Sequence, residues 1–267
     1  MTTRPALPLL RAAHTVPAFA VTMLTMLLAA SMGVRTRTSM TLFVAVFSGQ
    51  LVVGWTNDLV DRERDRRVGR RDKPLATGQI SVGLVRSAVG VAGAVCVLTS
   101  LLCGLAAGLL HLLAVGAALA YNAGLKSTAF SWLPYSLAFG ALPAVVGLAR
   151  DPAALPPWWM VSVGALLGFA AHLLNAMPDL ADDAATGVRG LPHRLAPTTV
   201  PILAAVALVA ATVVAVFGSC TPPTAAQWVL LAVVLVLALA ATRTRGKTPF
   251  YAAIAIAGVN VVMLLIG

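Results

Sequence analysis

The chain has 267 residues, of which 59% are hydrophobic and only 10% are charged, and its mean hydropathy is +0.90. In soluble domains about a quarter of the residues carry charge, so this chain has too little polar surface for a water-soluble enzyme or a secreted domain. The net charge of +10 does not indicate nucleic acid as a partner, because the basic residues lie in short segments between apolar runs, as in cytoplasmic loops of membrane proteins. Anionic lipid headgroups and anionic substrates are the expected partners.

Apolar runs recur along the whole chain, and about 20 residues are enough to cross a bilayer as a helix. The predicted helices lie at 12–32, 39–60, 81–103, 106–123, 129–149, 157–177, 197–217, 225–242 and 248–266. The predicted fold class is therefore all-α, a polytopic membrane bundle of about nine transmembrane helices that forms one domain over residues 1–267. The run at 106–123 is short, so a bundle of eight spans remains an alternative.

The charges between the runs predict the orientation. With nine spans, seven basic residues in 61–80 fall on the same side of the membrane as Arg4, Arg11 and Lys126. Because basic residues concentrate on the cytoplasmic side, we expect a multi-pass protein of the cell membrane with a cytoplasmic N-terminus. Arg4 and Arg11 also precede an apolar stretch, as in a signal peptide, but the many later spans favour an uncleaved first helix. The excess of arginine over lysine and the abundance of alanine indicate a bacterial source.

The segment NDLVDRERD, at 57–65, places four acids at the end of an apolar run, where carboxylates are costly unless they have a partner or a function. Eight of the nine acids lie in 58–72 and 179–183, and only Asp151 lies elsewhere. A shift of 118 residues superimposes six identities, which are Asn57 and Asn175, Asp61 and Asp179, Asp65 and Asp183, Gly69 and Gly187, Arg71 and Arg189, and Pro74 and Pro192. This internal repeat predicts two similar half-bundles around a central chamber.

The spacing of these residues supports a particular chemistry. Positions i, i+4 and i+8 lie on nearly one face of a helix, so Asn57, Asp61 and Asp65 would project an amide and two carboxylates together. Asn175, Asp179 and Asp183 would do the same, although Pro178 indicates a kink. Such oxygen ligands favour Mg²⁺. With basic residues nearby, the pattern is typical of a site that binds diphosphate, while solvated helix caps paired with arginines are the structural alternative.

The same residues resemble the motifs of the UbiA-type intramembrane prenyltransferases. NDLVDRERD followed by GRRDKPLATGQIS is similar to the first aspartate-rich motif of the family, NAMPDLADDAATGVRGLPHRL to the second, and YNAGLK at 121–126 to a tyrosine-to-lysine loop motif. The resemblance implies that Mg²⁺ and diphosphate are held by Asn57, Asp61, Asp65, Asp179 and Asp183. It also implies that Lys126, Arg71, Lys73 and Arg189 contact diphosphate oxygens, and that Asp58 orients the helix end.

Other residues have two interpretations each. His172 precedes Asn175 by three residues and either acts on an acceptor or is a hydrogen-bonded core histidine, which is the commoner case. Tyr135 and Phe139 either line a prenyl tunnel or simply pack. Arg62, Arg64 and Arg66 serve topology and lipid headgroups, with contact to the substrate as an alternative for Arg66. The remaining assignments are structural: Trp158 and Trp159 form an outer interfacial belt, and Cys96, Cys103 and Cys220 are small packing residues.

The predicted function is Mg²⁺-dependent transfer of an isoprenyl group from a prenyl diphosphate to a small-molecule acceptor, expected to be aromatic. The alternative is a terpene cyclase of the same family, in which double bonds of the substrate itself quench the cation, because both reactions need the same aspartates. Chain length and acceptor stay open, since Asn122 after Tyr121 and the short chain depart from the family pattern. Transport is a weaker third possibility, because transporters place polar groups near the membrane midplane, where this chain offers only Asn260 and His172.

Overall fold

The computed structural model describes residues 6–243 and 248–266. Every regular element in these residues is a helix, which confirms the predicted all-α class. Each predicted run overlaps one long helix. These helices are α2 (Thr15–Ser31), α3 (Thr36–Arg67), α4 (Val82–Leu102), α5 (Leu105–Ala123), α6 (Leu133–Leu148), α7 (Trp158–Ala176), α9 (Thr199–Phe217), α10 (Ala225–Arg243) and α11 (Thr248–Ile266).

Not all of these helices have the length of a membrane span. Within the described ranges, five are long and apolar enough to cross a bilayer, or six if the bent pair α1 (Ala6–Ala12) and α2 is one span. The helix α6 has 16 residues, fewer than the roughly 20 that a bilayer requires. The positions of the predicted helices are therefore confirmed, while nine complete spans stay a prediction.

The first predicted helix is broken near its start. The axes of α1 and α2 differ by 67°, and His14 between them has a positive φ of 51°. Pro17 explains the break, because its ring would clash with the carbonyl oxygen of Ala13 if the helix continued through both residues. In the first turn of α2 the missing N–H of Pro17 costs no hydrogen bond. The bend places His14 beside the acidic end of α3.

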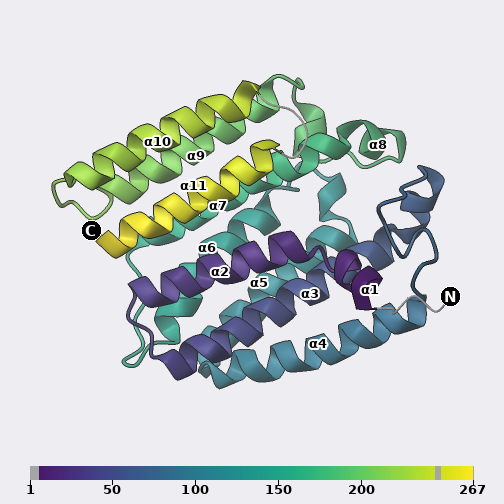
Figure 1. Ribbon diagram of the computed structural model, residues 1–267, viewed down its shortest axis with the longest axis horizontal. Coiled ribbons are helices and arrows are strands. Elements are labelled where there is room, and N and C mark those ends of the chain that lie inside the picture. The colour runs from purple at the N-terminus through teal and green to yellow at the C-terminus, as the bar shows by residue number, and fades with distance from the viewer. Residues whose placement is uncertain (1–5, 244–247, 267) are drawn as a thin grey trace.

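Two groups of helices form the bundle, as Figure 1 shows. The helices α7, α9, α10 and α11 lie in one group, α2 to α5 lie in the other, and α6 lies between them. The short helix α8 (Leu180–Ala185) and the loop that follows α3 lie at the same end of the bundle. The topology thus brings the two acidic segments, far apart in sequence, to one end of the protein.

Glycines of α7 allow α6 and α7 to approach each other closely. A Cβ on Gly164 would lie 2.5 Å from the carbonyl oxygen of Phe139, and one on Gly168 would lie 2.4 Å from that of Tyr135. Small residues four positions apart let membrane helices pack backbone against backbone. This contact fixes α7, which leads into the second acidic segment, against the aromatic side chains of α6.

Candidate active site

The first acidic segment continues α3 beyond the apolar run. The helix ends at Arg67, and Gly69 follows with a φ of 70°, a left-handed conformation that glycine adopts without strain. Asp61 and Asp65 are therefore helical and lie on one face, with exposed fractions of 5% and 3%. The predicted side-by-side arrangement of these carboxylates is confirmed.

The second acidic segment is not one straight helix. Helix α7 ends at Ala176, a single 3₁₀ turn follows at Met177–Asp179, and α8 begins at Leu180. Pro178 ends α7 because it cannot donate the next helical hydrogen bond, as the predicted kink implies. Asn175 is exposed and its Nδ2 donates to the hydroxyl of Tyr135 at 3.2 Å. The side chains of Asp179 and Asp183 are 43% and 16% exposed.

Arg64 joins the two segments. Its guanidinium lies 3.1 Å from Asp61, 3.8 Å from Asp65 and 3.3 Å from Asp183. The prediction that Arg64 contacts lipid headgroups is wrong for this structure, because its side chain is only 25% exposed and lies among the carboxylates, while its part in the topology stays a prediction. The spacing contained the signal: Arg64 follows Asp61 by three residues and thus lies on the same helical face.

Two further cations complete the ionic network. The Lys126 ammonium forms an ion pair with Asp61. Arg70 donates to Asp179 at 2.9 Å and to Asp72 at 2.9 Å. The hydrogen bond and the positive charge of Arg70 lower the pKa of Asp72 to about 2. In turn, the hydrogen bonds to Asp72 and Asp179 and the negative charges of these carboxylates raise the pKa of Arg70. Every cation in this network reaches an acid of one or both motifs.

The carboxylate of Asp183 is in a less favourable environment. Burial raises its pKa, and the nearby charge of Asp179 raises it further, whereas Arg64 acts in the opposite direction. A raised carboxylate pKa means that the charged form lacks sufficient compensation. A bound divalent cation at this end of the bundle would supply it.

Within the described residues, the other predicted diphosphate ligands form no ion pair with Asp61, Asp65, Asp179 or Asp183. Lys73 is buried, and its ammonium donates to Asp58 at 2.7 Å and to His14 at 2.9 Å. Arg71 and Arg189 are exposed on the loops that follow the two motifs. Of the four predicted diphosphate ligands, Lys126 is the one that pairs with an acid of the network in the described residues. The roles of all four residues toward diphosphate stay predictions.

The donor set fits Mg²⁺ in its chemistry. In the part of the chain that the structure describes, no three His, Cys, Asp or Glu side chains are close enough to form a metal site. Carboxylates of both motifs nevertheless lie within 3.8 Å of one guanidinium, and all of them offer the hard oxygen ligands that Mg²⁺ prefers. The residues predicted to hold the ion stay Asn57, Asp61, Asp65, Asp179 and Asp183.

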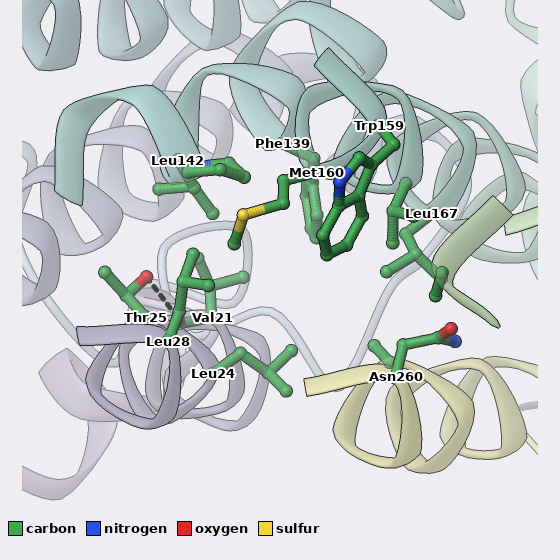
Figure 2. A pocket seen from close by; sticks show the side chains of 15 residues that line it. Val21, Leu24, Thr25, Leu28, Phe139, Leu142, Trp159, Met160, Leu167 and Asn260 are labelled. Atoms are coloured by element: carbon green, nitrogen blue, oxygen red, sulfur yellow. Dashed lines mark hydrogen bonds between the residues drawn. The ribbon is translucent and has the colours of Figure 1, made fainter. Parts of the chain in front are cut away.

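Aromatic residues and an apolar pocket lie further along the bundle. The rings of Tyr121, Tyr135 and His172 contact one another with centroids 5.2 to 5.7 Å apart, and Phe139 stacks on Tyr135. Phe139 also lines a cavity of about 60 Å³. Figure 2 shows that side chains of α6 and α7 form one side of this pocket and those of α2 and α11 the other. Phe139 thus lines an apolar pocket and Tyr135 does not, while a prenyl tunnel lined by either residue stays a prediction.

The comparisons with known proteins agree with this geometry. The model of the UbiA prenyltransferase family matches residues 18–263. The chain belongs to the UbiA family. It is also 34% identical over 155 residues to "Protoheme IX farnesyltransferase 2" of Natronomonas pharaonis, a match that covers 55% of this chain and 36% of the relative. The chain thus aligns with about a third of the length of that protein.

Solved structures of UbiA homologues have the same fold. A homologue from Aeropyrum pernix superimposes with a TM-score of 0.75 at 17% identity, covering 99% of this chain and 98% of the homologue. A homologue from Archaeoglobus fulgidus bound to GPP and Mg²⁺ gives a TM-score of 0.70 at 17% identity, covering 97% and 100%. These identities are low, so the likeness establishes a multi-pass UbiA membrane fold and not the substrates.

Proposed function

We propose that this UbiA-family protein is a Mg²⁺-dependent prenyltransferase that ionises a prenyl diphosphate and transfers the isoprenyl group to a small-molecule acceptor, expected to be aromatic. The observation that carries the proposal is the convergence of Asp61, Asp65 and Asp183 on Arg64. Two acidic segments that converge at a membrane surface, with apolar helices behind them, suit a ligand with a polyanionic head and an apolar tail. The GPP and Mg²⁺ bound to the Archaeoglobus fulgidus homologue support this assignment.

Each group has a specific role in the proposal. Asn57, Asp61, Asp65, Asp179 and Asp183 hold Mg²⁺, which when bound supplies positive charge to the diphosphate oxygens. Lys126, Arg71, Lys73 and Arg189 donate to the same oxygens. In this role the ammonium of Lys73 leaves Asp58 and binds a phosphate oxygen. The ammonium of Lys126 likewise leaves Asp61 for a phosphate oxygen.

The reaction breaks the allylic C–O bond, and the bonding electrons leave with the diphosphate. Lys126 and the arginines stabilise the charge that develops on this leaving group. The apolar helices exclude water from the allylic cation. A π bond of the acceptor then supplies the electrons of the new C–C bond, and a proton leaves the acceptor for a base or for solvent.

The test is product formation by the purified full-length protein. It would receive geranyl, farnesyl or geranylgeranyl diphosphate with Mg²⁺, alone and with a panel of aromatic and lipid acceptors. We expect diphosphate release that depends on an acceptor, and no release by Asp61→Ala. A cyclic hydrocarbon formed without acceptor would establish the cyclase instead, and the absence of release under every condition would contradict both reactions.

The orientation belongs to the proposal as well. We place the N-terminus in the cytoplasm of a bacterial cell, so that the site faces a cytoplasmic supply of prenyl diphosphate. The basic residues in 61–80 support this placement, because they adjoin the site and follow the positive-inside rule.

A further inference from the structure

The hydroxyl of Ser131 joins three segments that are distant in sequence. Ser131 precedes α6 and has an exposed fraction of 0%. Its Oγ accepts from the backbone N–H of Leu191 at 2.8 Å and lies 3.0 Å from Nε2 of His172, which is 1% exposed. Leu191 begins the 3₁₀ turn Leu191–Arg194, which follows the second acidic motif. One buried hydroxyl therefore ties this turn to α7 and to the loop before α6.

Two partners fix the position of the Ser131 hydroxyl. Its oxygen accepts from the backbone N–H of Leu191, and its single hydrogen is free to donate to Nε2 of His172. Among the described residues, Nε2 is the ring nitrogen of His172 that has a hydrogen-bond partner, since the buried Nδ1 has none. The contact with Ser131 is therefore the hydrogen bond that holds this imidazole in place.

The same contact determines the position of Lys126. Gly190 directly precedes Leu191, and a Cβ on Gly190 would lie 2.5 Å from the carbonyl oxygen of Lys126 and 2.8 Å from Oγ of Ser131. The backbone of the loop after the second acidic motif therefore packs directly against the backbone of Lys126 at Gly190. The ammonium of Lys126 in turn pairs with Asp61 of the first motif. A direct series of contacts leads from His172 to the acidic site.

We propose that Ser131, His172 and Gly190 are positioning residues that hold Lys126 where it binds the diphosphate of the substrate. None of the three touches the substrate in this scheme; they act through Lys126. The inference rests on the proposed function, which makes Lys126 a diphosphate ligand. It gives a role to the Gly-Leu-Pro segment at 190–192, because only a residue without a side chain lets this loop reach Ser131 and Lys126 together.

The experiment compares two buried serine–histidine pairs in the full-length protein. Ser131→Ala is expected to raise the KM for a prenyl diphosphate about fivefold, since a displacement of the ammonium by an ångström weakens its hydrogen bonds steeply. The matched control is Ser100→Ala, because Ser100 is 1% exposed and its Oγ lies 2.7 Å from Nδ1 of His111. The control loses the same kind of bond away from the acids, so its KM should stay at the wild-type value.

A double-mutant cycle separates positioning from general destabilisation. If Ser131 acts through Lys126, adding Ser131→Ala to Lys126→Met leaves the KM of the Lys126→Met variant unchanged, because coupled residues are non-additive. His172→Gln, whose amide oxygen also accepts from Ser131, should change the KM less than twofold. The inference would be overturned if Ser131→Ala and Lys126→Met raised the KM in a fully additive way. It would also be overturned if Ser131→Ala and Ser100→Ala changed the KM equally.

A second route applies if Ser131→Ala does not fold. Gly190→Ala should raise the same KM, since its new methyl group would displace the Lys126 backbone, whereas Gly116→Ala has no atom within 4 Å of its Cβ and should leave the KM unchanged. An unchanged KM for Gly190→Ala overturns the positioning role. A wild-type protein that releases no diphosphate contradicts the proposed function itself, so the two failures are distinguishable.

Discussion

Replacing Arg64 by methionine removes the cation that joins the carboxylates of the two acidic motifs. Arg64 makes one charged hydrogen bond, 3.1 Å to Asp61, and lies 3.3 Å from Asp183. A charged hydrogen bond contributes roughly 1.5–3 kcal/mol to stability, and the 25% exposure of the side chain reduces this value by solvent screening. We expect Arg64→Met to lower the free energy of unfolding of the metal-free protein by about 2 kcal/mol, or about 4–8 °C in apparent melting temperature.

Mg²⁺ should reverse this loss. In the metal-free protein Arg64 neutralises the carboxylates that Mg²⁺ would neutralise when bound, so Arg64 and the ion compete. The Arg64→Met variant should therefore bind Mg²⁺ about 30-fold more tightly than the wild type, the equivalent of roughly 2 kcal/mol. Thermal unfolding in detergent, measured with EDTA and with increasing Mg²⁺, gives both quantities. Arg35→Met is the control, because the pair of Arg35 with Asp151 is 70% and 65% exposed and should matter by less than about 1 °C. Identical Mg²⁺ responses of wild type and Arg64→Met would refute this reasoning.

Further predictions concern the site, the packing and the orientation. Asp61→Ala and Asp179→Ala should each reduce product formation at least about 100-fold with unchanged helix content by circular dichroism; turnover near the wild-type rate in both would remove the site assignment. EDTA should abolish turnover and added Mg²⁺ restore it, whereas activity that persists in EDTA would count against the metal. Gly168→Val should lower the apparent melting temperature by several degrees, roughly 2–4 °C per kcal/mol, because even a Cβ there would lie 2.4 Å from a backbone oxygen of α6. Cys220 is exposed and Cys96 buried, so an impermeant maleimide should label Cys220 from outside intact cells; labelling only after lysis would reverse the orientation.

Much of the site was predictable because the residues of each acidic motif lie within a few positions of one another in the sequence. The offset of 118 residues that relates Asn57, Asp61 and Asp65 to a second set needs no structure to be seen, and helical geometry then places Asp61 beside Asp65. The bridging role of Arg64 could not be predicted, because an arginine beside a membrane has several uses and one of its two closest partners, Asp183, is distant in sequence. Ser131 has no sequence pattern that marks it, since its partners lie 41 and 60 residues away.

The sequence by itself determined the membrane class, the positions of the long helices and the residues of both acidic motifs. These follow from hydrophobic runs, from the cost of charge near hydrocarbon and from an internal repeat, all of which are readable along the chain. Only the tertiary structure decided that Arg64 bridges the motifs, that Lys73 pairs with Asp58, and that Gly190 lies against the backbone of Lys126. Such contacts depend on how helices pack and where loops cross, and close packing is set by side-chain and backbone shape over long sequence separations.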